Sequence, residues 1–304
     1  MVYGGVGTEE IQLNEETIWG GGPHNNNNPK AYGVLQKVRE LIFAGKEEEA
    51  EKMMAENFLT GQNGMPYQTI GSLKLSFKGD TVSKEYRREL DLNQALCTVR
   101  YKVGEVTFTR RYFTSLVDHA LIVRIEADHP HAISFNAAYT SPYAVYKVSS
   151  KGNDLLLNGR GADHEGIKGA IRFETRTRVK TSGGKVKMKS DHIEVSQADA
   201  VTIYVSAATN YVNYKDVSAN ESRRVAGYLD QAVKRPYEEA LDAHVKAYKK
   251  LFDRVTLDVG TSSSEETPLR LKHFKEGKDQ GLVSLMFQFG RYLLISSSQP
   301  GGQP

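Results

Sequence analysis

The spacing of hydrophobic and polar positions changes along the chain, and the change predicts the fold. From Thr69 to about Ala208, apolar and polar residues alternate in short runs separated by glycine-containing turns. Alternation with period two places every second side chain on the same face of a strand. The runs predicted as strands are residues 73–77, 99–103, 106–109, 121–125, 133–139, 155–157, 171–179, 186–188, 192–195 and 201–207. Many short strands at regular spacing favour antiparallel sheets packed as a large β-sandwich.

A helical pattern precedes the β region. Apolar residues between positions 29 and 58 recur at helical spacing, with Gly45 as an interruption and Gly61 as the end. Asn28 is expected to cap the first helix, and Pro29 to occupy its first turn. The sandwich is therefore predicted to carry an early helical insertion.

A second helical region follows the β region. Ser218 and Glu221 have the spacing of a capping box, and an apolar stripe continues to Phe252. Pro236 should kink this helix or divide it into two, since proline removes a helical hydrogen bond. The alternation over residues 255–259 predicts one more strand.

The last part of the chain predicts a linker and a further helix. Residues 261–268 are rich in serine and glutamate, whereas residues 282–295 carry a broad apolar face at helical spacing. A helix with such a face needs neighbours on several sides.

Composition places the chain among ordinary globular proteins. It has 304 residues, of which 39% are hydrophobic and 25% charged, with a formal net charge of +3. The 40 basic and 37 acidic residues are interspersed, which indicates neither a nucleic-acid partner nor a membrane partner. No apolar run reaches the roughly 20 residues of a membrane span.

The N-terminus has neither the basic region nor the hydrophobic region of a signal peptide. Localisation stays open, and a secreted or periplasmic parent protein is compatible with the sequence.

Signals for a cofactor or metal are weak. The single cysteine, Cys97, lies in a predicted strand and is interpreted as a small core residue rather than a nucleophile. His129 and His131 flank a turn with no further ligand cluster, so they are interpreted as solvated. The glycines at residues 3–7 lack the strand and GK[ST] context of a phosphate loop. We expect no cofactor and no metal.

The most informative segment is residues 13–28, LNEETIWGGGPHNNNN, which contains the only tryptophan, Trp19. A large aromatic ring offers a flat apolar face to pyranose C–H groups, and glycines let a backbone approach a ligand closely. The four asparagines are interpreted as a turn before a helix, with sugar-binding amides as the alternative. Glu15 and Glu16 are paired carboxylates beside an aromatic ring, which is a pattern of glycosidase acid–base chemistry. The alternative is a strand end with an ordinary salt bridge.

Six ordered blocks closely resemble glycoside hydrolase family 95, the α-L-fucosidase and α-L-galactosidase family. They are VYGGVGTEEIQLNEETIWGGGP, MPYQTIGSLKLSF, YRRELDLNQALCTVRY, FTRRYFTS, YKKLFDRVTLDVG and FQFGRYLLISSSQPG. The resemblance implies a mainly β fold in three parts. Residues 1–217 would form a β-super-sandwich, residues 218–268 a helical linker with one strand, and residues 269–304 the truncated start of an (α/α)6 catalytic barrel.

The resemblance also implies a function and a site. An inverting exo-glycosidase would remove terminal α-L-fucosyl or α-L-galactosyl groups from oligosaccharides such as plant or host glycans. The family's catalytic carboxylates lie in the barrel beyond this chain, so no catalytic residue is expected here. Asn14, Glu15, Thr17 and Trp19 would form a substrate-binding rim, and the alternative places Trp19 in the core or at the domain interface. Tyr67 matches the family strongly and would line the same side or the core.

Two functions from other classes compete with this one. The chain could be a non-catalytic carbohydrate-binding or structural sandwich, or a piece of a family 65-like glycoside phosphorylase, since that family shares the architecture. The family 95 resemblance implies that the catalytic barrel is the missing packing partner of residues 282–295. The 304-residue chain alone is therefore predicted to be inactive and poorly soluble or oligomeric.

Overall fold

The computed structural model describes residues 1–60, 64–79, 81–299 and 302. The strands are β1 (Thr8–Leu13), β2 (Gly71–Phe77), β3 (Lys84–Asp91), β4 (Leu96–Val103), β5 (Val106–Ser115), β6 (Ala120–Ala127), β7 (Ile133–Thr140), β8 (Tyr146–Lys151), β9 (Asp154–Arg160), β10 (Arg172–Ser182), β11 (Lys185–Met188), β12 (His192–Ala198) and β13 (Ala200–Thr209). The helices are α1 (Ala31–Phe43), α2 (Glu47–Asn57), α3 (Glu221–Ala232), α4 (Tyr237–Phe252), α5 (Thr267–His273) and α6 (Gly281–Ser297), with a 3-10 turn at Phe274–Glu276.

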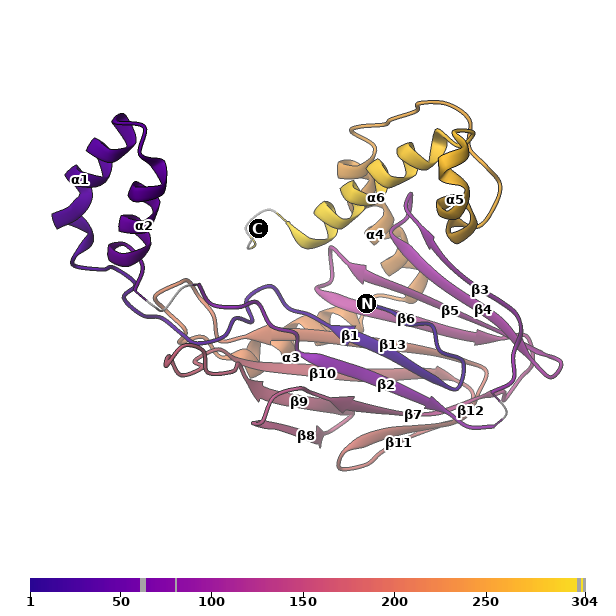
Figure 1. Cartoon of the computed structure of the whole chain (residues 1–304). Helices are drawn as coiled ribbons and strands as arrows, with labels where there is room; N and C mark the ends of the chain where they lie inside the picture. Colours follow the sequence, from indigo (N-terminus) through magenta and orange to yellow (C-terminus); the bar gives the residue numbers. More distant parts are fainter. Residues whose placement is uncertain (61–63, 80, 300–301, 303–304) are drawn as a thin grey trace.

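Two antiparallel sheets form the body of the molecule (Figure 1). The five-stranded sheet has the order β1-β2-β7-β12-β11, and the eight-stranded sheet has the order β3-β4-β5-β6-β13-β10-β9-β8. The main core lies between them, where Leu73 and Phe135 of the first sheet share a cluster with Val123 and Ile203 of the second. The structure confirms the predicted sandwich with early helices and C-terminal helices.

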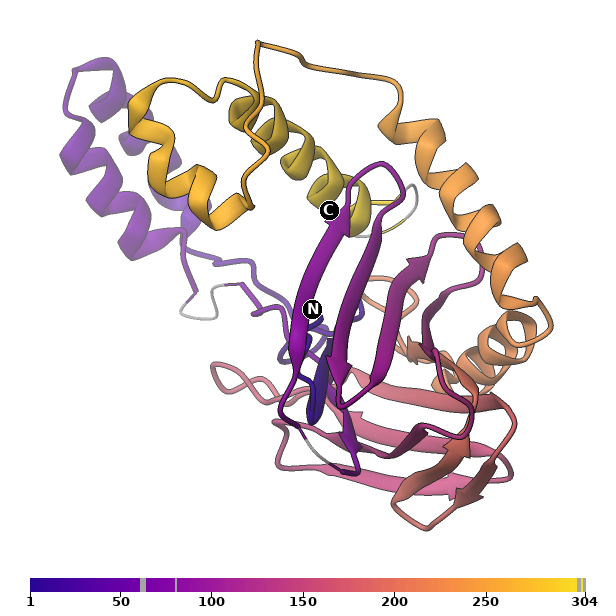
Figure 2. The same ribbon diagram turned by 90° about the vertical axis from the view of Figure 1, so that its right-hand side faces the viewer.

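Two helices add a third layer on the outer face of the eight-stranded sheet. Helix α3 packs on β10 and β13, and α4 continues along β5 (Figure 2). Phe113 and Ile122 of the sheet are buried with Leu229 of α3 and Ala240 of α4 in a second core. The eight-stranded sheet therefore has buried apolar residues on both faces.

A buried ion pair crosses the main core. Arg110 of β5 and Glu9 of β1 have fully buried side chains, with 3.6 Å between the Arg110 guanidinium and the Glu9 carboxylate. Arg110 donates to the carbonyls of Gly5 and Val6, and Glu9 accepts from the Tyr112 hydroxyl at 2.8 Å. These contacts tie the N-terminal segment and the first sheet to the second sheet.

Every run predicted as a strand between residues 73 and 207 coincides with a strand of the structure. Three strands were not predicted, and two of them, β3 and β8, are sheet edges whose side chains are mostly exposed on both faces. The prediction of a strand over residues 255–259 is wrong. This segment is irregular, and Val255 and Val259 are exposed because no neighbouring strand pairs with it.

The helix starts differ from the predictions by a few residues. Helix α1 begins after Lys30 rather than at Pro29, and Asn28 forms a turn by accepting from the Lys30 amide. The capping box at Ser218 is wrong, because Asn220 caps α3 by accepting from the Arg223 amide at 2.8 Å. The division of the helical region at Pro236 is confirmed. Gly61, the predicted end of the early helices, lies outside the described residues.

Candidate functional site

The loop after β1 carries the tryptophan and packs against the segment that precedes β2. Ile18 is fully buried, and Trp19 forms an isolated β-bridge with Tyr67. The two rings meet edge to face, with centroids 5.5 Å apart, and the Trp19 indole donates to the Glu16 carbonyl at 3.0 Å. Trp19 is half-buried and Tyr67 is exposed, so the pair presents aromatic surface to solvent beside a fixed backbone.

The Glu15 carboxylate lies beside this aromatic pair in a partly buried position. One of its oxygens accepts from both the amide and the hydroxyl of Thr17, each at 2.7 Å. The Thr17 hydroxyl is also 2.5 Å from that of Thr209, which anchors the loop to β13. Burial raises the pKa of Glu15, and the hydrogen bonds from Thr17 oppose that rise only in part. A carboxyl held in this way can accept hydrogen bonds from hydroxyl groups of a ligand.

Asn14 completes the polar edge of the rim. It is exposed next to Tyr67, and burial together with the nearby Glu15 charge raises the pKa of the Tyr67 hydroxyl, while a hydrogen bond with Asn14 lowers it. The structure therefore brings Asn14, Glu15, Thr17 and Trp19 together with Tyr67. The sequence signal for Tyr67 was its family-like segment. The structure places Tyr67 at the surface beside Trp19 rather than in the core, since its side chain is 45% exposed.

The glycines after Trp19 serve contacts within the protein. The Gly20 amide donates to the Pro66 carbonyl and the Gly21 amide to the Ala162 carbonyl, both at 2.9 Å. A Cβ added to Gly21, whose φ is +62°, would lie 2.4 Å from the Met65 sulfur, and one added to Gly22 would lie 2.6 Å from the Ala170 Cβ. The close approach that glycine permits here is therefore between three protein loops.

The asparagine run forms turns, as expected from its interpretation as a turn before a helix. The Asn25 side chain accepts from the Asn27 amide at 3.0 Å. Asn26 bonds the Thr60 hydroxyl, and Asn28 donates to the Leu59 carbonyl at 2.8 Å. These bonds join the two ends of the α1–α2 hairpin at its base.

Comparison with known families decides what this architecture is. Residues 1–214 match the model of the glycosyl hydrolase family 65 N-terminal domain, and residues 236–304 match that of the glycosyl hydrolase family 95 catalytic domain. The chain belongs to these families: it is a family 65 N-terminal domain joined to the start of a family 95 catalytic domain.

Curated relatives match this family 95 chain over almost its whole length. Alpha-L-fucosidase 2 from Arabidopsis thaliana is 32% identical over 337 aligned residues, which cover 99% of this chain and 40% of that protein. Proteins named probable alpha-fucosidase A from Aspergillus niger and Aspergillus oryzae are 27% and 23% identical, and they match 100% of this chain over 40% and 44% of their own lengths. The chain spans about two fifths of the length of these relatives.

The family 95 region ends close to the Trp19 loop. Helix α6 packs one side on α4, where Ile295 is buried with Tyr248 and Phe252. After this helix the chain returns toward the rim, because a Cβ added to Gly302 would lie 2.4 Å from the Glu16 carboxylate. The two segments that carry the strongest family resemblance therefore meet in space.

The predicted broad apolar face of α6 is present. Large side chains on its free side are exposed: Val283, Met286, Phe287, Phe289, Leu293 and Leu294. The family 95 region thus contributes a helix that has a partner on one side.

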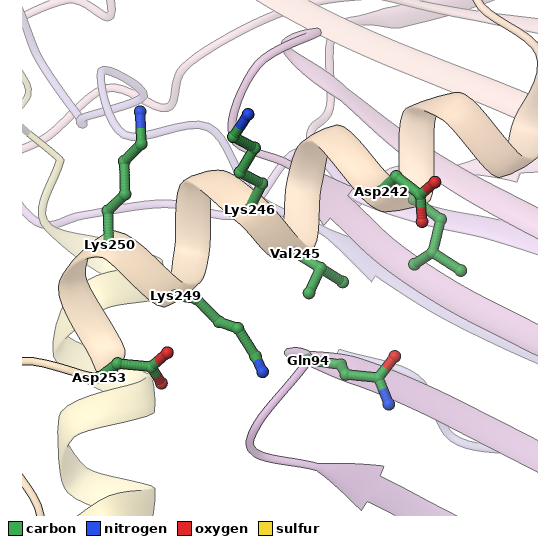
Figure 3. A pocket seen from close by; sticks show the side chains of 8 residues that line it. Gln94, Asp242, Val245, Lys246, Lys249, Lys250 and Asp253 are labelled. Carbon is green, nitrogen blue, oxygen red and sulfur yellow. The ribbon is translucent and has the colours of Figure 1, made fainter.

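A hollow lies along α4 and is lined by residues of that helix together with Gln94 (Figure 3). It has a volume of about 680 Å³, and the Lys249 side chain points across it toward Gln94. Its carboxylates, Asp242 and Asp253, are separated by three turns of helix, or roughly 16 Å along the axis. That separation exceeds the roughly 6.5–9.5 Å between the carboxyl groups of an inverting glycosidase. This hollow does not carry such chemistry.

Other candidate groups have ordinary environments. His129 and His131 are exposed beside Asp128 and Asp199. Burial raises the pKa of the Cys97 thiol to about 11, which keeps it protonated and unreactive. Among the described residues, no three His, Cys, Asp or Glu side chains gather as a metal-binding group. Within the same residues, every helix is too short or too polar to cross a membrane.

Proposed function

We propose that this chain is the N-terminal portion of an inverting exo-glycosidase that hydrolyses terminal α-L-fucosyl, or α-L-galactosyl, linkages in oligosaccharides. The supporting observation is the order of two family matches on one chain, together with relatives named as fucosidases that align with nearly all of it. The substrates would be fucosylated plant or host glycans.

The proposed division of labour follows the family resemblance. Residues 1–217 act as the β-super-sandwich, residues 218–268 as the linker, and residues 269–304 as the beginning of the (α/α)6 barrel. Inversion needs a general acid and a water-activating base on opposite sides of the anomeric carbon. Both belong to the barrel beyond Pro304, so the 304-residue chain alone is inactive.

The rim residues are proposed to contact the sugar rather than to carry out its hydrolysis. Trp19 offers a ring edge and face beside Tyr67, while Asn14 and Glu15 provide polar groups, and Thr17 holds Glu15 in place. Gly302 of the family 95 region lies against the same loop, which brings the rim next to the start of the catalytic domain.

The chemistry is tested with a chromogenic aryl α-L-fucoside. We expect no turnover by the purified 304-residue chain, and turnover by the same chain extended through a complete family 95 catalytic domain. NMR of the reaction as it proceeds would identify inversion if the β-anomer of the released fucose appears before the α-anomer. Turnover by the 304-residue chain that disappears in Glu15→Gln or Glu16→Gln would contradict the placement of the catalytic groups.

The rim is tested in the active, extended protein with Trp19→Ala and, as a matched control, Tyr214→Ala. Tyr214 is an exposed aromatic residue on a different loop. Loss of about 1–2 kcal/mol of ring contact should weaken substrate binding roughly 5–30-fold for Trp19→Ala and leave the control unchanged. Equal KM values in both variants would remove Trp19 from the rim.

One observation favours a second function enough to test it. The match over residues 1–214 is to a family 65 domain, and family 65 includes phosphorylases that share this architecture. The same extended protein is therefore assayed with and without inorganic phosphate. Formation of a sugar 1-phosphate would establish a phosphorylase, whereas free sugar independent of phosphate supports hydrolysis. Sugar binding without either product would favour the non-catalytic module.

A further inference from the structure

The α1–α2 hairpin stands clear of the sandwich, joined to it only at its base (Figure 1). Its two helices pack on each other through a small cluster of Val38, Leu41 and Ala50, with Met53 and Phe58 at the edge. The cluster uses only one side of α1. The opposite side is left without a partner inside the described part of the chain.

The free side of α1 is apolar at regular helical spacing. Tyr32 and Phe43 are 88% and 87% exposed, and Leu35 and Ile42 are exposed between them. At 100° per residue these four side chains fall within about one third of the helix circumference, with Arg39 in the same stripe. We call Tyr32, Leu35, Arg39, Ile42 and Phe43 the α1 stripe. Apolar side chains that recur on one face of a helix, here at i, i+3, i+10 and i+11, are the anchors of a helix that docks on another protein surface.

The base of the hairpin is braced, so the direction of the α1 stripe is fixed by the fold. Asn26 bonds Thr60, and Asn28 bonds the Leu59 carbonyl, which closes the two ends of the hairpin on each other. The preceding loop is held to two other loops through the Gly20 and Gly21 amides. These hydrogen bonds at the base indicate that the hairpin has a fixed orientation rather than serving as a flexible linker.

The position of the hairpin indicates what covers the stripe. In Figure 1 the hairpin rises on the same side of the sandwich as α5 and α6. The exposed face of α6 belongs to the family 95 match, and Gly302 lies against Glu16 in the loop that leads to the hairpin. A domain that continues from α6 would therefore start on the side of the sandwich from which the hairpin rises.

We propose that the α1 stripe is a docking surface for the family 95 catalytic domain of the same polypeptide, so that the hairpin holds that domain over the Trp19 rim. This proposal rests on the proposed function only in that a catalytic domain follows the sandwich. A glycan is the poorer occupant, because Leu35 and Ile42 offer no hydrogen bonds and Arg39 is the single charged group in the stripe. A second copy of the chain is a separate outcome of the test.

The test compares thiol accessibility in two proteins, the 304-residue chain and the chain extended through a complete family 95 catalytic domain. The extension is the chain's own continuation or, if its reading frame closes at Pro304, the corresponding segment of the Arabidopsis relative. Single substitutions Tyr32→Cys and Phe43→Cys are placed in a Cys97→Ala background. Val186→Cys is the control. Val186 is exposed on β11, which is the edge strand opposite β1 in the five-stranded sheet.

We expect Tyr32→Cys and Phe43→Cys to react with a maleimide at least tenfold more slowly in the extended protein than in the 304-residue chain, and Val186→Cys to react equally in both. Tyr32→Ser and Phe43→Ser should lower the Tm of the extended protein and leave that of the 304-residue chain unchanged. Equal reactivity of the hairpin thiols in both proteins would overturn the proposal. So would protection that appears in the 304-residue chain as its concentration rises, since that outcome identifies a second copy. Neither maleimide reactivity nor Tm depends on fucosidase activity. An extended protein whose hairpin thiols are protected but which shows no turnover would therefore contradict the proposed function and leave the docking proposal intact.

Discussion

The buried ion pair of Glu9 and Arg110 allows the effect of one substitution on the stability of the sandwich to be predicted in magnitude. Arg110→Met keeps most of the side-chain volume but removes the guanidinium, which also lies 3.8 Å from the Phe77 ring centroid. The Glu9 carboxylate is then left in the core without its cation. Removing one partner of a buried ion pair costs about 3–5 kcal/mol, because the other charge stays buried and uncompensated. We expect the free energy of unfolding to fall by that amount.

A double-mutant cycle separates the pairing from the loss of packing. Glu9→Gln leaves the Arg110 guanidinium as the unpaired buried charge, so this single change should also be costly. The double variant Glu9→Gln, Arg110→Met removes both charges and should cost less than the two single changes added together. Contacting residues of this kind show coupling of about 0.5–3 kcal/mol.

The measurement is urea-induced unfolding followed by far-UV circular dichroism, which reports on the sheets. Arg111→Met is the control, because Arg111 is the next residue on β5 and pairs at 2.7 Å with Glu126 at a site where both side chains are 37% exposed. An exposed pair of that kind is worth up to about 1 kcal/mol. The reasoning fails if Arg110→Met is no more costly than Arg111→Met, or if the double variant loses the full sum of the two single effects.

Four further outcomes can be checked by simple measurements. Asn220→Ala should lower the free energy of unfolding in urea by about 1 kcal/mol by removing the α3 cap, whereas an equal loss in Ser218→Ala would restore the capping box. Burial raises the pKa of Glu15 above its ordinary value of 4.5. Ionisation of this carboxyl therefore opposes folding, and the free energy of unfolding falls as pH rises above 4.5. Glu15→Gln should therefore raise Tm at pH near 7 and have no effect at pH near 4, and a lower Tm near pH 7 would show that the carboxylate stabilises the loop. With its pKa near 11, Cys97 should react with iodoacetamide at pH near 8 at least tenfold more slowly in the native chain than in urea; equal rates would show an accessible thiolate. Met286→Glu on the exposed face of α6 should reduce self-association in size-exclusion chromatography, and an unchanged elution volume would exclude that face as its cause.

The sequence predicts most strands that have one buried face, with β1 as the exception, because its buried face includes the charged residue Glu9. Runs such as β7 alternate between buried and partly exposed positions, and their pattern carries the fold class. The edge strands β3 and β8 were missed because their side chains face solvent on both sides and show no alternation in hydrophobicity. The opposite error occurred at residues 255–259, where alternation is present but the segment is not paired as a strand. Pairing partners are a property of the whole fold and are absent from a local pattern.

Long-range polar contacts are the part of the structure that a single sequence does not predict. Glu9 is in phase with Ile11 and Leu13 on β1, so its burial follows from the alternation. Its partner Arg110 comes from another sheet, and nothing in the local pattern of β5 distinguishes it from the half-exposed Arg111. The same holds for Thr17 and Thr209, whose contact anchors the candidate rim to β13. Their hydroxyls meet only because the fold brings the loop after β1 beside the end of β13.

The Trp19 loop shows how one sequence feature can have two physical meanings. Three glycines beside a tryptophan fit a backbone that approaches a sugar, and they fit equally a backbone that approaches its own protein. The contacts of Gly21 with Met65 and of Gly22 with Ala170 establish the second meaning. The consequence for function is nevertheless favourable, because a loop locked to two others holds the indole ring in one position before any ligand arrives. The same locked loop is the root of the α1–α2 hairpin, so whatever fixes the hairpin against a neighbouring domain also fixes Trp19 relative to that domain.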